Sequence, residues 1–152
     1  GVFRGVNSEW FFKMLNIQRM YLVDPYLEYE DYHDGRKILH DFSEVKKKAS
    51  NILYEWETQK KLRWIYETSD DAFAKQYIPD DLDFIYIDAN HSYEFVKKDI
   101  ENSWNHLKKG GILIGHDFAL YEVAKAVIEF AEKNKLKVIT KAKDWEWIII
   151  KE

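Results

Sequence analysis

The sequence predicts an α/β fold, a mainly parallel sheet covered by helices that ends in an antiparallel hairpin. Two short apolar runs, residues 84–87 and 112–114, have the composition of strands buried on both faces. Apolar residues recur at helical spacing between them, and the right-handed crossover rule makes these two strands parallel. The last two predicted strands, 137–140 and 146–151, are joined by residues 141–144. That connection is too short for a crossover helix, so this pair is antiparallel.

Length and composition are those of one folded domain. The chain has 152 residues, of which 46% are hydrophobic, and we expect a single domain over residues 1–152. Its net charge of −4 provides no basic excess to neutralise phosphates, which argues against nucleic acid as a partner. The absence of cysteine excludes disulfides and fits a cytoplasmic location. No apolar run approaches the ~20 residues of a membrane span, so no membrane association is expected. The oligomeric state is not predicted.

The first half of the chain is predicted to alternate helices and strands. Asn7 or Ser8 offers a capping oxygen for the first helix, and Asp41 or Ser43 does so for the second. In chain order we predict a helix to about Leu15, a strand at 19–23, a loop or irregular insertion at 26–40, a helix to about Thr58, a strand at 62–67 and a short helix at 68–77.

The second half contains the central strand–helix–strand unit. Residues at helical spacing form the inner face of its helix: Tyr93, Val96, Ile100, Trp104 and Leu107. Residues 108–111 (KKGG) are expected to close this helix with cations and glycine. A final helix ends near Asn134, and Trp145 and Trp147 are expected to pack in the sheet of the terminal hairpin.

Acidic residues and histidines follow the predicted strands. In open α/β sheets, ligands bind outside the carboxyl ends of the strands. The residues at that edge are Asp24, Asp88, His91, His116 and Asp117. Each has an alternative interpretation: Asp24 as a helix cap or turn residue before Pro25, Asp88 in an Asx turn, and His91 with Ser92 as a cap of the following helix. His116 and Asp117 could also line an acceptor pocket without holding a metal.

Four segments of the sequence carry a family resemblance: GVFRG with NSEW, YLVDPY, DFIYIDANHSYEFVKKDI and LKKGGILIGHDF. They resemble the class I S-adenosylmethionine-dependent methyltransferases, within them the methyltransferase domain 24 subgroup. The likeness runs from Gly1 to about Trp147, in the order and spacing of the family. Two features depart from it: no acidic residue precedes the first glycine, and the glycine motif is G-x-x-x-G. A glycine-rich turn carries a strand into a helix, so we expect a strand before Gly1 that is missing from this sequence.

The resemblance implies a Rossmann-like sandwich, S-adenosylmethionine as cofactor, and roles for individual residues. Cofactor binding would fall to Gly1, Gly5, Asp24, Ser69, Asp70 and Asp88. Asp24 would hold the ribose hydroxyls, and Ser69 and Asp70 would flank the adenine. His91, three residues after Asp88, would be the catalytic base. Related metal-dependent enzymes hold a divalent ion such as Mg²⁺ or Mn²⁺ at the positions of Asp88, His116 and Asp117.

The expected function is methylation, with a hydroxyl of a small-molecule or sugar-like acceptor as the target. Asp88 and Asp117 would orient the base, the acceptor or a metal. The alternative is a non-catalytic methyltransferase-like module that serves in binding or assembly. A nicotinamide-dependent oxidoreductase is disfavoured by the terminal hairpin and by the absence of G-x-G-x-x-G. His33, His40 and His106 are expected at the surface, and Tyr26, Tyr29 and Tyr32 either cover an acceptor or pack on the core.

Overall fold

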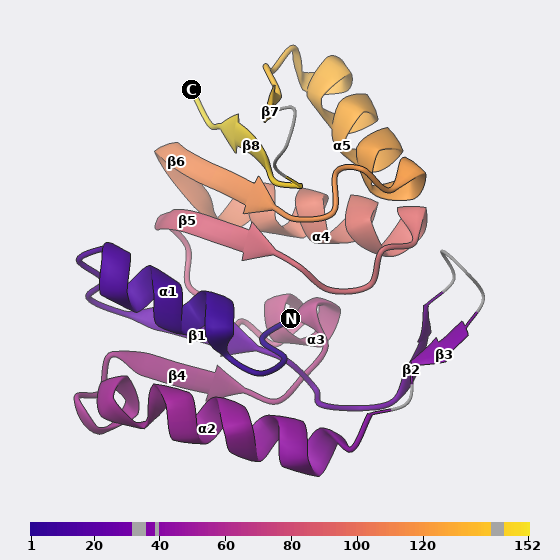
Figure 1. The fold of residues 1–152 in the computed structure, drawn as a ribbon. Coiled ribbons are helices and arrows are strands. Elements are labelled where there is room, and N and C mark those ends of the chain that lie inside the picture. Colours follow the sequence, from indigo (N-terminus) through magenta and orange to yellow (C-terminus); the bar gives the residue numbers. More distant parts are fainter. Residues whose placement is uncertain (32–35, 39, 141–144) are drawn as a thin grey trace. The chain divides into compact units, whose positions relative to one another are not determined.

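The computed structural model describes residues 1–31, 36–38, 40–140 and 145–152 (Figure 1). They form two compact units, each with its own sheet and helices. Unit 1 comprises residues 1–29 and 37–77, and unit 2 comprises residues 30–36 and 78–152.

Unit 1 is built on two parallel strands, β1 (Met20–Val23) and β4 (Leu62–Ile65). Its helices are α1 (Val6–Met14), α2 (Phe42–Thr58) and α3 (Ser69–Ala74). Because the strands are parallel and in register from Met20↔Leu62 to Val23↔Ile65, both carboxyl ends lie at one edge of the sheet. The predicted order of elements is confirmed, with boundaries shifted by one to three residues.

The core of unit 1 lies where α2 packs against its neighbours. Val45, Ala49 and Leu53 are the buried residues of this helix, spaced four residues apart as a single apolar stripe requires. Phe12 of α1 stacks on Trp56, with ring centroids 5.0 Å apart. Asp41 is the N-cap of α2, its side chain accepting a hydrogen bond from the Glu44 N–H, as the sequence predicts.

Two short strands occupy the segment between β1 and α2. They are β2 (Tyr29–Asp31) and β3 (Arg36–Ile38), which pair in a two-stranded sheet. The prediction of a loop or irregular insertion at 26–40 is therefore wrong for these six residues. His33 and Tyr32 lie outside the described residues.

Unit 2 is a four-stranded mixed sheet in the order β5-β6-β8-β7. Its strands are β5 (Leu82–Ile87), β6 (Leu107–Gly115), β7 (Ile139–Thr140) and β8 (Trp147–Ile150), and its helices are α4 (Tyr93–His106) and α5 (Tyr121–Asn134). β5 and β6 are parallel, whereas β8 is antiparallel to both β6 and β7. The strand–helix–strand unit and the antiparallel terminal pair are confirmed; the connection 141–144 lies outside the described residues.

One helix of unit 2 ends earlier than the sequence predicts. Leu107 is the first residue of β6, and residues 108–111 belong to that strand instead of closing α4. The register passes from Leu82↔Leu107 to Phe84↔Ile112, so β6 holds extra residues at this point, and Gly110 takes a positive φ of 78° there. Lys151 caps α4 instead: its Nζ donates to the carbonyls of Trp104 (2.6 Å) and Leu107 (2.7 Å).

A single apolar cluster joins the sheet and both helices of unit 2. Its buried residues are Val96, Ile100, Leu107, Leu113, Val123, Ala126, Val127, Phe130, Ala131, Trp147 and Ile149. The strands are less buried than the sequence predicts. Residues 84–87 of β5 are only half-buried, and in β6 Leu113 is buried while Ile112 and Ile114 are half-buried. None of these residues is exposed, so both faces are covered, but less completely than the sequence predicts.

Candidate active site

Two parallel strand ends bring the candidate residues of unit 2 together. Ile87 and Gly115 are paired as the last residues of β5 and β6, so Asp88 and His116 leave the sheet side by side. The His116 N–H extends the pairing by donating to the Ile87 carbonyl at 3.1 Å. Parallel strands are ~4.8 Å apart, so side chains that follow them can act on one ligand.

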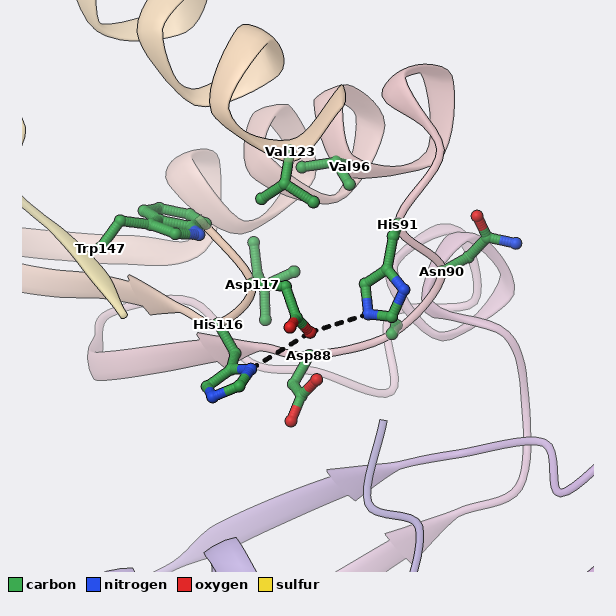
Figure 2. A pocket seen from close by; sticks show the side chains of 10 residues that line it. Asp88, Asn90, His91, Val96, His116, Asp117, Val123 and Trp147 are labelled. Atoms are coloured by element: carbon green, nitrogen blue, oxygen red, sulfur yellow. Dashed lines mark ion pairs between the residues drawn. The ribbon is translucent and has the colours of Figure 1, made fainter. Parts of the chain in front are cut away.

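Asp117 lies between two histidines, as Figure 2 shows. Its Oδ2 is 2.9 Å from His91 Nε2 and 3.1 Å from His116 Nδ1. The hydrogen bond from His91 holds the pKa of Asp117 below its usual value, against the opposing effect of burial. Asp117 takes a left-handed φ of 58°, a backbone conformation that aspartate tolerates better than most side chains.

The pKa of Asp88 is shifted in the opposite direction. Burial raises the pKa of this carboxyl, and the negative charge of Asp117 adds to the effect, while His116 opposes it. One ligand atom from each of Asp88, His116 and Asp117 lies within 4.8 Å of the others. Two carboxylate oxygens and one imidazole nitrogen are a donor set that fits a divalent cation, and such a cation would offset the repulsion between the carboxylates.

The loop that carries His91 is fixed by side chains on both sides. Asn90 Oδ1 accepts a hydrogen bond from the Ser92 N–H at 2.9 Å, and Glu122 Oε2 accepts one from the Tyr93 N–H at 2.8 Å. Ser92 is the N-cap residue of α4 but makes no capping hydrogen bond with its side chain. Glu122, from α5, therefore does the capping that the structural alternative assigned to His91 and Ser92.

A small hollow of about 10 Å³ adjoins these side chains, enough for one water molecule. It is lined by Ile87, Asp88, Ala89, Asn90, His91, Val96, His116, Asp117, Val123 and Trp147. Trp147 is fully buried, and among the described residues its Nε1 has no hydrogen-bond partner. Its indole lies over Gly115, so closely that a Cβ at that position would be 2.6 Å from Nε1.

Trp145 differs from Trp147. The sequence predicts that both pack in the hairpin sheet, and this is wrong for Trp145, which is 48% exposed. Its indole is stacked with the His116 imidazole, with ring centroids 6.5 Å apart and planes 15° from parallel. The Trp145 carbonyl accepts a hydrogen bond from the Phe118 N–H at 2.8 Å, which ties this residue to the loop after β6.

In unit 1, Asp24 is the centre of a hydrogen-bond network. Its Oδ2 accepts from the N–H groups of Val2 (2.8 Å) and Phe3 (2.9 Å), and its Oδ1 accepts from the Tyr26 N–H (2.8 Å). The Tyr26 hydroxyl donates to the Phe3 carbonyl at 3.0 Å. Asp24 therefore makes the turn contact expected before Pro25 and also holds the N-terminal loop. Three of about four acceptor positions of the carboxylate are in use.

Gly5 has a structural reason to be glycine. It is the N-cap of α1 with φ 79°, a left-handed conformation that favours glycine. A Cβ there would lie 3.2 Å from Leu53 Cδ1 and 3.3 Å from Ala49 Cα, so α1 begins in close contact with α2. The predicted capping of α1 by Asn7 or Ser8 is wrong, because the helix begins at Val6. Gly1 is exposed.

Ser69 and Asp70 begin α3 at the same sheet edge as Asp24. Thr68 is the N-cap of this helix, its hydroxyl accepting from the Asp71 N–H at 3.2 Å. The Asp24 N–H donates to the Ile65 carbonyl at 3.1 Å, which extends the β1–β4 pairing to the residues after the strands. Both predicted adenine residues are half-buried.

The other histidines and tyrosines singled out in the sequence have contacts of their own. His40 contacts Phe3, with ring centroids 5.1 Å apart, and His106 Nδ1 is 3.0 Å from Asp80 Oδ1. Tyr26 is buried and packs against Trp64, which favours the core-packing alternative for this tyrosine. The side chain of Tyr29 lies outside the described part of the structure.

A Rossmann-like α/β sheet with acidic residues at its strand ends and an antiparallel hairpin at its end is the architecture of class I S-adenosylmethionine-dependent methyltransferases. The chain belongs to the methyltransferase domain family, which it matches over residues 1–118. The enzyme class expected from the sequence is thereby confirmed. Among the described residues, no helix is long and apolar enough to cross a membrane.

Solved structures share this fold at low sequence identity. A proposed caffeoyl-CoA O-methyltransferase from Staphylococcus aureus is 16% identical with a TM-score of 0.70, covering 100% of this chain and 73% of its own. The O-methyltransferase TomG from Streptomyces achromogenes, solved with SAM, is 13% identical with a TM-score of 0.66, covering 100% and 71%. A proposed rRNA methylase from Clostridium thermocellum is 13% identical with a TM-score of 0.65, covering 99% and 81%. No curated protein has significant sequence similarity to this chain.

Proposed function

We propose that this protein transfers the methyl group of S-adenosylmethionine to a hydroxyl of a small-molecule acceptor, with His91 as the proton acceptor. The observation that carries the proposal is the 2.9 Å contact between His91 Nε2 and Asp117 Oδ2. A neutral imidazole that donates from Nε2 has its lone pair on Nδ1. Asp117 therefore sets the tautomer in which His91 can accept a proton, and it stabilises the imidazolium that forms.

Beyond a proton acceptor, the reaction requires mainly that the protein align the two reactants. When bound, S-adenosylmethionine would supply a methyl carbon on a positive sulfur: an acceptor oxygen would bond to that carbon, and the carbon–sulfur bond would break with its electron pair going to sulfur, leaving S-adenosylhomocysteine as a neutral thioether. The hydroxyl proton passes to His91 Nδ1. Because the cofactor is already activated by its positive charge, alignment of the two reactants supplies most of the rate enhancement. Asp88, beside Asp117, would orient the acceptor hydroxyl.

The cofactor would be held by residues at the strand ends. We assign ribose binding to Asp24 and adenine contacts to Ser69 and Asp70, with Gly1 and Gly5 shaping the loop near the methionine part. The hydrogen bonds of Asp24 refine this assignment. Because its carboxylate already accepts three N–H groups, a ribose hydroxyl must take the remaining acceptor position or displace the loop at Val2 and Phe3.

A divalent metal ion is the second candidate at this site. The grouping of Asp88, His116 and Asp117 within 4.8 Å favours it. When bound, Mg²⁺ or Mn²⁺ would lower the pKa of an acceptor hydroxyl. Asp117 Oδ2 already receives both imidazoles, however, and this supports the metal-free proposal.

One experiment separates the two candidates. Transfer of isotope-labelled methyl from S-adenosylmethionine to a library of hydroxylated small molecules is followed by mass spectrometry, with and without EDTA. We expect activity that survives EDTA and is lost in His91→Ala, because a hydroxyl attacks poorly while it keeps its proton. Loss with EDTA, recovery with Mg²⁺ and a merely slow His91→Ala would establish the metal-dependent alternative.

The acceptor class has its own test. The net charge of −4 argues against RNA, whereas the fold is shared with a proposed rRNA methylase. Labelled methyl found in RNA and in none of the small molecules would contradict the proposal. Activity that survives both chelation and His91→Ala would contradict the role of His91 and leave alignment as the main catalytic device.

A further inference from the structure

An exposed indole stands beside the candidate active site of unit 2. Trp145 is 48% exposed, although its ring is stacked with His116, which itself contacts Asp117 at 3.1 Å. The backbone carbonyl of Trp145 accepts the hydrogen bond from the Phe118 N–H, which ties this residue to the loop that carries His116 and Asp117. The hairpin therefore supplies a flat apolar surface next to a polar group of side chains.

The polar side chains of this group can bind several hydroxyls at once. The hollow is bordered by two carboxylates, Asp88 and Asp117, by the amide of Asn90, and by the imidazoles of His91 and His116. Ionised carboxylates accept hydrogen bonds only, and charge-assisted bonds from hydroxyls to them are among the stronger ones. A ligand that satisfies this group carries multiple hydroxyl donors.

A hydroxylated sugar ring has both an apolar face that suits the indole and several hydroxyl donors that suit the carboxylates. Its C–H groups form an apolar face that packs flat on an aromatic ring, and its hydroxyls point outward around the edge. A simple phenol has one or two hydroxyls and fits a mostly apolar slot. The side chains here are mostly polar, so they suit a phenol less well. The combination of an exposed indole with two carboxylates therefore favours the sugar over the phenol.

We propose that Trp145 determines acceptor specificity: its exposed indole packs against the C–H face of a pyranose ring whose hydroxyls are bound by Asp88 and Asp117. This inference rests on the proposed function and narrows its acceptor to a sugar. A further hydroxyl of the same ring, hydrogen-bonded to His91 Nδ1, receives the methyl group as it gives its proton to His91.

The test is saturation-transfer NMR on the full chain with saturating S-adenosylhomocysteine. The probes are methyl α-D-glucopyranoside and methyl α-L-rhamnopyranoside, with catechol as the phenolic comparison. We expect signal on the pyranoside ring C–H protons with the wild type and with Trp145→Phe, which keeps an aromatic surface. Trp145→Ala should reduce the apparent affinity about tenfold, the effect expected from losing one aromatic stacking contact.

Phe95→Ala is the matched control, since Phe95 is an equally exposed aromatic of unit 2 (49%) on α4, whereas it is Trp145 that is stacked with His116. It should behave as the wild type. Three results would overturn the inference: no pyranoside signal with the wild type, equal signal with Trp145→Ala, or Trp145-dependent binding of catechol in preference to both pyranosides. Calorimetry measures the affinity of each variant for S-adenosylhomocysteine separately. A wild type that does not bind S-adenosylhomocysteine would instead contradict the proposed function.

Discussion

The contact between Gly115 and Trp147 predicts a large effect from adding one methyl group. Gly115 is the last residue of β6 and is paired with Trp147 of the antiparallel strand β8. In Gly115→Ala the new Cβ would lie 2.6 Å from Trp147 Nε1 and nearer still to Cε2 and Cζ2, against a normal carbon contact of about 3.5–4.0 Å. The indole is fully buried among core side chains, so it has little space to move away.

We therefore expect Gly115→Ala to lower the free energy of unfolding by about 3 kcal/mol, the upper part of the range for overpacked cores. Urea unfolding followed by far-UV circular dichroism measures this. Methyl transfer should fall as well, because His116 and Asp117 follow Gly115 directly. Gly110→Ala is the control: its Cβ would meet nothing within 4 Å, so only the strain of its positive φ remains, about 1 kcal/mol.

A second substitution tests the cause. Trp147→Leu removes the indole from above residue 115, so it should cost less in the Gly115→Ala background than in the wild type. The double-mutant cycle should give a favourable coupling of about 1 kcal/mol or more, as for residues in direct contact. A Gly115→Ala protein within about 0.5 kcal/mol of the wild type, a change typical of harmless surface sites, would refute this reasoning.

Two further predictions concern the loops of unit 2. Glu122→Ala should destabilise the protein by about 1 kcal/mol, because the Tyr93 N–H loses its hydrogen-bond acceptor. Glu132→Ala, on the exposed face of the same helix, is the control and should have little effect. Equal urea midpoints for the two variants would contradict the capping role. His91→Ala should be less stable than the wild type at neutral pH but not in acid. The pKa of Asp117 in the folded protein is lowered mainly by His91, so their pairing stabilises the fold fully above the unfolded pKa of about 3.9. This stabilisation is lost as the pH falls through the folded-state pKa of Asp117. A stability difference that is constant with pH would contradict that pairing.

The sheet and its binding edge could be predicted because their signals are local. Short apolar runs such as 112–114 and the residues that directly follow them are adjacent in sequence, and the parallel crossover rule then places Asp88 beside His116. The end of α4 was mispredicted for a related reason. Lysines followed by glycines are typical of a helix end, but here β6 accommodates them as an irregular stretch of strand.

What the sequence could not predict depends on contacts between distant residues. Glu122 caps α4 from 29 positions away, and Asp24 binds the Val2 N–H from 22 positions away. The two hairpin tryptophans, two positions apart, have opposite environments, one fully buried and one 48% exposed. Strand alternation would place both on the same face, but β8 begins only at Trp147, so Trp145 lies before the strand and does not follow its pattern.

The central claim, that the strand-end residues bind S-adenosylmethionine, is tested most directly by a thermodynamic cycle on Asp24. Titration calorimetry compares S-adenosylhomocysteine with its 2′-deoxy analogue on the full chain of the wild type and of Asp24→Ala, with Asp80→Ala as a surface control. Asp24→Ala should weaken S-adenosylhomocysteine binding by roughly 1.5–3 kcal/mol, the scale of hydrogen bonds to a charged group. The deoxy analogue should bind more weakly than the parent ligand to the wild type but equally to Asp24→Ala, since the missing hydroxyl has then lost its partner. An unchanged affinity in Asp24→Ala, or an equal penalty for the deoxy analogue in both proteins, would contradict the account.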